Sequence, residues 1–106
     1  MPAIDQIEFV GLIGNRPLSL ITTNEFMNAL EKNGWGEAHN AHILQRLRER
    51  GSRWGIITPN DFARALRDGR TMPANEGALA RVCCHAQCWV IYRDDTCRFI
   101  TIRDPH

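Results

Sequence analysis

The chain has 106 residues and a mass of 12.1 kDa, which is the size of one ordinary domain and excludes a second domain of comparable size. Hydrophobic residues make up 43% of the sequence and charged residues 24%, a balance that excludes a disordered segment. The uncharged stretches are too short to cross a bilayer, and no basic-then-apolar leader opens the chain. We therefore expect one soluble, unprocessed domain over residues 1–106, with no membrane partner.

The formal net charge of +1 is unevenly distributed. Residues 1–40 carry five acidic and two basic side chains, a balance of −3, whereas the remainder carries seven acidic and eleven basic ones, a balance of +4. Twelve of the thirteen basic residues are arginine, whose planar guanidinium makes bidentate contacts with phosphate. This composition indicates either polyanion binding or an ordinary solvated surface encoded by a GC-rich genome.

The N-terminal residues 4–13 do not fit one period cleanly, so they indicate either a short amphipathic helix or a strand. After a turn, a helix is predicted over residues 25–33, with Asn24 as its N-cap and Gly34 at its end. Its apolar face consists of Phe26, Ala29 and Leu30.

The clearest helix is predicted from Gly36 to about Arg50, with Gly51 as its terminator. Its buried face is predicted to contain Ala41, Leu44 and Leu47. Intervals of three and four residues keep side chains on the same side of a helix. One polar stripe therefore contains His39, His42, Arg46 and Arg50.

A third helix is predicted to begin at Pro59, with Thr58 as its N-cap and Gly69 after its end. Its core face consists of Phe62, Ala65 and Leu66. Residues 72–77 are predicted to form a loop, since they contain proline, asparagine and glycine.

The C-terminal third is rich in β-branched, aromatic and cysteine residues, which favour strands. Three strands are predicted, over residues 79–84, 89–93 and 97–103, with a tight acidic turn between the last two. Helices followed by strands predict an α+β fold, in which N-terminal helices pack on a small twisted antiparallel sheet.

The four cysteines allow three interpretations. Without a secretory leader, a disulfide framework loses its context. A zinc site is a second interpretation, but adjacent cysteines on a strand point to opposite faces and no C-x-x-C pair is present. We therefore expect buried thiols at Cys83, Cys84, Cys88 and Cys97, with no metal bound to them or to the neighbouring His85.

The polar stripe on the second predicted helix is the clearest indication of a catalytic site. A histidine titrates near neutral pH, so His42 beside a phosphate can act as a base or an acid, and Arg46 can stabilise charge on the phosphoryl oxygens. RNA cleavage by its own 2′-hydroxyl needs only such groups, without a cofactor. The alternative is an exposed basic helix with surface histidines, because polar neighbours four residues apart are common on helices.

The segment HILQRLRERG at residues 42–51 closely resembles the H-x-x-x-R-[ML]-x-E-R-G signature of small bacterial toxin domains. These domains belong to the barnase, EndoU, colicin and RelE ribonuclease superfamily. In that pattern a short helix and a curved antiparallel sheet follow the signature. The sequences WVIYRDD at residues 89–95 and FITIRDP at residues 99–105 resemble its last two strands. The resemblance covers about residues 39–105.

The resemblance implies an active site formed by His42, Arg46 and Thr101. Secondary candidates for RNA binding are His39, Arg50, Tyr92 and Arg93. His39 lies one turn before His42 and departs from the usual pattern, so either histidine is a candidate for the key base. Residues 1–38 match no pattern of known function.

The expected function is therefore that of a metal-independent endoribonuclease toxin that cleaves tRNA or another structured RNA in a target cytoplasm. Such an activity implies an immunity or antitoxin protein as partner, acidic where it covers the basic cleft. The chain is either a free protein or the tip of a larger secreted toxin. The competing interpretation is a non-catalytic module that binds RNA or protein through the same arginine-rich face.

Overall fold

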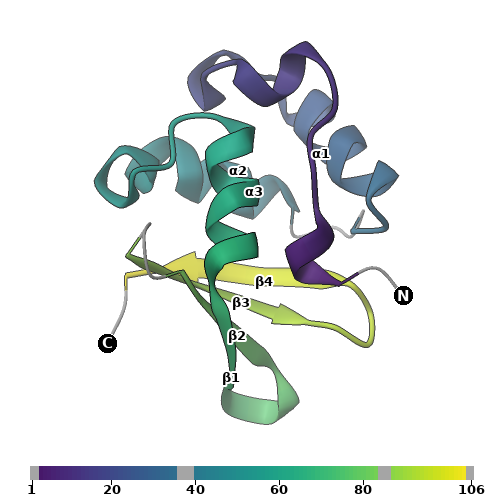
Figure 1. Cartoon of the computed structure of the whole chain (residues 1–106), viewed down its shortest axis with the longest axis vertical. Helices are drawn as coiled ribbons and strands as arrows, with labels where there is room; N and C mark the ends of the chain where they lie inside the picture. Colours follow the sequence, from purple (N-terminus) through teal and green to yellow (C-terminus); the bar gives the residue numbers. More distant parts are fainter. Residues whose placement is uncertain (1–2, 36–39, 84–86, 105–106) are drawn as a thin grey trace.

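The computed structural model describes residues 3–35, 40–83 and 87–104. Within these ranges, three α-helices lie on one side of an antiparallel sheet with strand order β1-β2-β3-β4 (Figure 1). The helices are α1 (Thr23–Lys32), α2 (Asn40–Arg50) and α3 (Pro59–Asp68), and the strands are β1 (Arg70–Pro73), β2 (Leu79–Cys83), β3 (Cys88–Arg93) and β4 (Arg98–Arg103). The predicted α+β class, with helices N-terminal to an antiparallel sheet, is confirmed.

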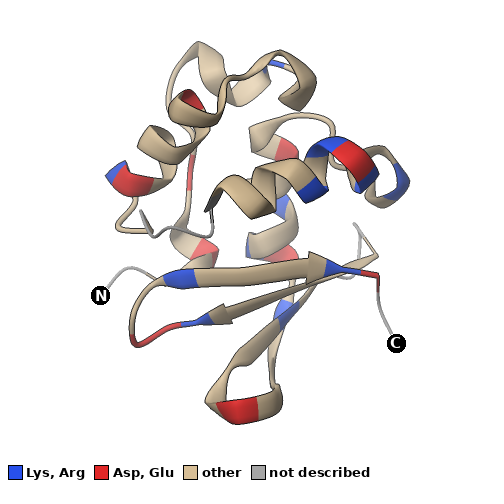
Figure 2. Ribbon diagram, turned by 180° about the vertical axis from the view of Figure 1, so that it is seen from behind, with Lys and Arg blue, Asp and Glu red and all other residues tan. Residues whose placement is uncertain are grey.

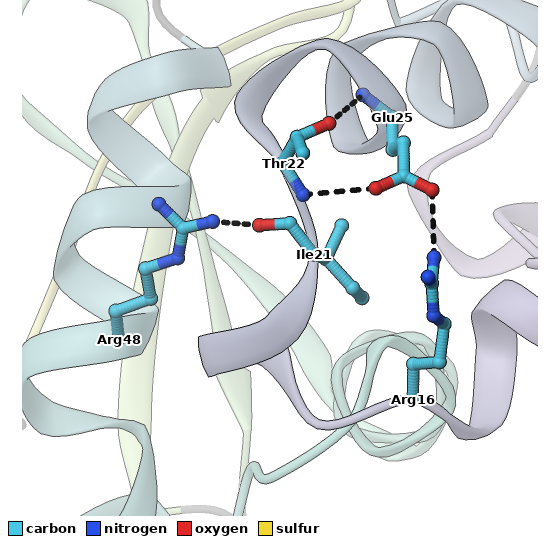
Figure 3. A network of polar contacts seen from close by, with 5 residues as sticks. All are labelled: Arg16, Ile21, Thr22, Glu25 and Arg48. Carbon is cyan, nitrogen blue, oxygen red and sulfur yellow. Dashed lines mark hydrogen bonds and ion pairs between the residues drawn. The ribbon is translucent and has the colours of Figure 1, made fainter.

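Helix α1 begins earlier than predicted, because its N-cap is Thr22 and not Asn24. The Thr22 hydroxyl accepts a hydrogen bond from the Glu25 backbone N–H at 3.1 Å, and the Glu25 carboxylate accepts one from the Thr22 N–H at 3.1 Å (Figure 3). These reciprocal bonds satisfy two backbone donors that the first helical turn leaves free. The Thr22 N–H and the Arg16 guanidinium hold the pKa of Glu25 below its usual value.

Helix α3 matches its prediction. Thr58 caps it, Pro59 occupies the first turn and Asp61 completes the same kind of reciprocal cap. The three residues predicted for its core face are buried, and they are Phe62, Ala65 and Leu66.

Helix α2 is described from Asn40, so its predicted start at Gly36 and the candidate His39 lie outside the described residues. The predicted buried face is wrong at Ala41, which is exposed. The buried side chains are instead Ile43, Leu44 and Leu47, so the buried face is turned away from Ala41. This orientation buries the larger Ile43 side chain, which removes more apolar surface from water than an alanine methyl group would.

Gly51 follows α2 directly and is buried. A side chain there would collide with the carbonyl oxygen of Ile56. The chain therefore folds back closely on itself through a 3₁₀ turn, η4 (Gly51–Trp54). Gly51 thus ends the helix as predicted, by allowing this close backbone approach.

Strand β1 replaces part of the loop predicted over residues 72–77. It pairs antiparallel with β2 at the edge of the sheet, from Arg70 opposite Val82 to Pro73 opposite Leu79. All four residues of β1 are exposed, so the segment lacks the apolar alternation that marks a half-buried strand. Its conformation comes from pairing with β2, which the local sequence does not encode.

The N-terminal segment forms neither the predicted α-helix nor a strand, but three 3₁₀ turns, η1 (Ile4–Gln6), η2 (Leu12–Asn15) and η3 (Leu18–Leu20). Its buried apolar residues nevertheless join one continuous core that extends to β4, and they are Ile4, Ile7, Phe9, Leu18 and Ile21. Arg48 on α2 fastens the segment by donating a hydrogen bond to the carbonyl oxygen of Ile21 (Figure 3). It donates another to the carbonyl oxygen of Leu18. Residues of this segment thus help to hold α2 in place.

The described cysteines Cys83, Cys88 and Cys97 are buried, as expected. A hydrogen bond between Cys83 and Cys88 lowers the pKa of Cys83 and, with burial, raises that of Cys88. No group of metal-ligating side chains occurs among the residues that the structure describes, while Cys84 and His85 lie outside them. In the same ranges, no helix has the length and apolar character needed to span a membrane.

Candidate active site

Helix α2 packs against β4, one of the two edge strands of the described sheet (Figure 2). This packing brings together two residues separated by 59 positions in the sequence. Nε2 of His42 lies 3.3 Å from Oγ1 of Thr101, within hydrogen-bonding distance, and the contact is partly buried. Two of the three predicted catalytic residues therefore touch each other.

Thr101 lies next to a β-bulge in β4. The register against β3 shifts by one residue between Phe99 and Thr101, which leaves Ile100 as an extra residue in a β-bulge. Phe99 and Ile102, on either side, stay fully buried in the core. Bulges re-aim side chains near the edges of sheets, and Thr101 beside this one reaches His42 with its hydroxyl.

The other cations of the predicted stripe lie on the same side of α2. Arg46 and Arg50 follow His42 at intervals of four residues, and all three side chains are half-buried. Figure 2 shows basic positions in the C-terminal half of α2 and at both ends of β4. The helix therefore presents positive charge beside the contact between His42 and Thr101.

Asp104, directly after β4, fastens this strand to the turn that follows α2. Its carboxylate accepts hydrogen bonds from the Trp54 indole N–H at 2.7 Å and from the Arg53 guanidinium at 2.6 Å. The Trp54 bond, with the nearby charges of Arg53 and Arg50, holds the pKa of Asp104 below its usual value. We assign Asp104 a positioning role, which the sequence analysis missed because the contact spans 50 residues.

Two secondary candidates lie away from His42. Tyr92 is buried on the helix-facing side of the sheet, where its hydroxyl lies 2.8 Å from Oγ1 of Thr71 and its ring packs on Trp35. Arg93 donates to the backbone oxygen of Glu76 at 3.3 Å and pairs with Asp95 at 3.7 Å. These contacts give Tyr92 and Arg93 structural partners at other places in the sheet.

The arrangement offers three kinds of chemical group. His42 supplies an imidazole that can accept or donate a proton, Thr101 supplies a hydroxyl, and the arginines of α2 supply fixed positive charge. Such a set suits a reaction at a phosphate, since it combines proton transfer with stabilisation of developing negative charge.

Comparison of the chain with protein family models, with curated proteins and with solved structures finds no match. Any function of this chain is therefore inferred from its own residues and their geometry.

Proposed function

We propose that the protein is an endoribonuclease that cleaves RNA without a metal ion. The observation that carries this proposal is the 3.3 Å contact between His42 and Thr101, beside the arginine stripe of α2. One fold can host unrelated activities, so this group of side chains supports the proposal and the α+β class does not.

In the proposed reaction, the 2′-oxygen of one nucleotide bonds to the adjacent phosphorus, and the bond from phosphorus to the 5′-oxygen of the next nucleotide breaks. The 2′-hydroxyl loses a proton and the departing 5′-oxygen gains one, and His42 serves in one of these two transfers. Arg46 stabilises the charge on the phosphoryl oxygens, and the Thr101 hydroxyl orients His42 or the phosphate. The products are a 2′,3′-cyclic phosphate and a free 5′-hydroxyl.

The substrate that we propose is tRNA or another structured RNA in the cytoplasm of a target cell. Sequence-specific proteins read unpaired loops in such RNA, because their bases are accessible. A toxin of this kind requires an immunity or antitoxin protein in the producing cell. Complementary charge predicts an acidic surface on that partner where it covers α2.

The test is cleavage of total tRNA by the wild-type chain and by His42→Ala, with Gln45→Ala as a control at an exposed position of the same helix. We expect His42→Ala to lose about 10²–10⁴-fold in rate, the range of general acid–base catalysis, and Gln45→Ala to keep its activity. Equal rates for the wild type and His42→Ala would remove His42 from the mechanism. RNA binding without cleavage would favour the non-catalytic alternative.

Two further measurements test the chemistry itself. A single 2′-deoxy substitution at the scissile nucleotide should block cleavage, because the nucleophile is gone. Activity should survive EDTA, since no metal takes part. Cleavage at a deoxy site, or activity lost in EDTA and restored by a divalent ion, would contradict the mechanism.

A further inference from the structure

The face of the sheet turned away from the helices carries a second group of apolar side chains. Directly paired residues of antiparallel strands share a face, so the register places Trp89 and Ile91 of β3 on the same face as Thr101 and Arg103 of β4. Ala80 of β2 pairs with Ile91 and extends this group. None of the three α-helices lies on this face of the sheet (Figure 1).

This face is hollowed. A pocket of about 410 Å³ lies between the strands and the loop that joins β1 to β2. Its size falls within the range of small-ligand sites, and its apolar floor with a few polar groups at the rim is typical of them. Its lining includes Ala80, Trp89, Ile91, Ile100, Thr101 and Arg103.

A planar group is already stacked at one end of the pocket. The guanidinium carbon of Arg103 lies 5.4 Å from the centroid of the Trp89 ring. Unpaired bases stack on aromatic side chains such as that of Trp89 and on guanidinium groups such as that of Arg103. Arginine also binds phosphate. A base can take the place of the guanidinium on the indole, which leaves Arg103 free to pair with the neighbouring phosphate.

The pocket and the candidate active site share Thr101, which lines the pocket and contacts His42 at the edge of the sheet. Thr101 and Arg103 are two positions apart on β4, a spacing of about 7 Å along a strand. A group stacked on Trp89, opposite Arg103, is thus one nucleotide away from a phosphate held at Thr101.

The charged side chains around the pocket indicate which of its ends would hold a phosphate. Glu76 at the opposite rim would repel a phosphate, so the phosphate belongs at the end with Arg103 and Thr101. We infer that this pocket binds one unpaired nucleobase of RNA, stacked on Trp89, next to the bond cleaved at His42. This inference rests on the proposed function and adds the subsite that selects the nucleotide.

The experiment measures binding of a short 2′-O-methyl RNA, which resists cleavage through the 2′-hydroxyl. The wild-type chain, Trp89→Ala and Trp89→Phe are compared by fluorescence anisotropy of the labelled RNA. We expect Trp89→Ala to bind about 10–100-fold more weakly, since stacking on the indole is lost, and Trp89→Phe to recover most of the affinity. Leu12→Ala is the control, because Leu12 is an apolar residue that is 86% exposed outside the sheet.

Tryptophan fluorescence gives a second measurement on the wild type. Trp35 and Trp54 are buried, at 0% and 3% exposure, so quenching by a stacked base reports on Trp89. An RNA with an abasic residue at the bound position should bind more weakly and quench less. Melting curves of both Trp89 variants establish that they are folded.

The outcomes separate this subsite from the catalytic proposal. Unchanged affinity in folded Trp89→Ala, or equal binding of abasic RNA, overturns the subsite even if the wild type cleaves RNA. Base-dependent binding at Trp89 with no cleavage by the wild type supports the subsite and overturns the nuclease. Absence of any RNA binding overturns the subsite and assigns the open face to a protein partner.

Discussion

Helices α2 and α3 have nearly the same length, yet they use their polar residues differently. Each buries an apolar face in the common core. On α3, the arginines Arg64 and Arg67 are exposed to water. On α2, the stripe that contains His42 and Arg46 is half-buried beside β4.

This difference separates scaffold from candidate site. Covering a polar side chain costs free energy unless it finds partners, whereas an exposed arginine costs little. The half-buried stripe of α2 therefore needs an explanation beyond packing, and the phosphate binding that we propose would supply one. The polar face of α3 needs no such explanation.

The largest effect on this comparison is expected from Phe62→Ala on α3. Phe62 is fully buried and its ring packs against Phe26 and Phe99. Loss of the ring should lower the free energy of unfolding by about 3–5 kcal/mol, measured by urea denaturation. Arg64→Ala on the same helix should change it by less than about 0.5 kcal/mol. A smaller loss for Phe62→Ala than for Arg64→Ala would mean that α3 is not the scaffold.

Arg46→Lys on α2 should have the opposite effect, because it should lower activity and leave stability unchanged. The charge is kept but the bidentate fork is lost, so we expect the rate of RNA cleavage to fall by about tenfold or more. The melting temperature should stay nearly constant, because the guanidinium is only half-buried. Arg64→Lys on α3 is the matched control and should cleave like the wild type. Equal rates in both variants would refute the assignment of Arg46.

How much the sequence reveals depends on how local the determining contacts are. Helix α3 was predicted correctly because Thr58, Pro59 and the apolar spacing all lie within one short segment. The cap of α1 was misplaced because Thr22 and Asn24 are both good cap residues. The reciprocal partner Glu25 distinguishes them, three residues after Thr22.

Contacts between distant segments explain the remaining differences. The stripe of His42 and Arg46 follows from helical spacing alone, but Thr101 entered only through the resemblance of its strand to a known pattern. The β-bulge beside Thr101 and the bonds of Asp104 to Trp54 depend on how β4 meets α2. A local sequence pattern does not determine pairings between distant segments. Strand β1 was not predicted for the same reason.

The caps of α1 and α3 allow a finer comparison. Thr58→Ala should lower the free energy of unfolding by about 1 kcal/mol, since the side chain accepts a hydrogen bond from the Asp61 N–H at 3.2 Å. Thr22→Ala should have a similar effect through Glu25. Thr96→Ala, in the exposed turn between β3 and β4, is the control and should cost less. Chemical denaturation measures all three, and equal losses in all of them would show that the caps contribute nothing specific.

The smallest effect concerns the attachment of α2 to β4 through Asp104, and it depends on pH. The pKa of Asp104 is lowered in the folded protein by Trp54, Arg53 and Arg50, so the stabilisation is present above the unfolded-state pKa near 4 and is lost as the pH falls through the lower folded-state value. Asp104→Asn keeps an acceptor for the indole N–H of Trp54 but removes the titrating group. The melting temperature of this variant should therefore depend less on pH below about 4 than that of the wild type. Because the Asp104 side chain is 43% exposed, solvent and salt screen these interactions, and the difference should shrink at high salt. Asp68→Asn on α3 is the control at an exposed carboxylate. If Asp68→Asn reduces the pH dependence of the melting temperature as much as Asp104→Asn does, then Asp104 is an ordinary surface charge. It would then not be a positioning contact between β4 and the turn after α2.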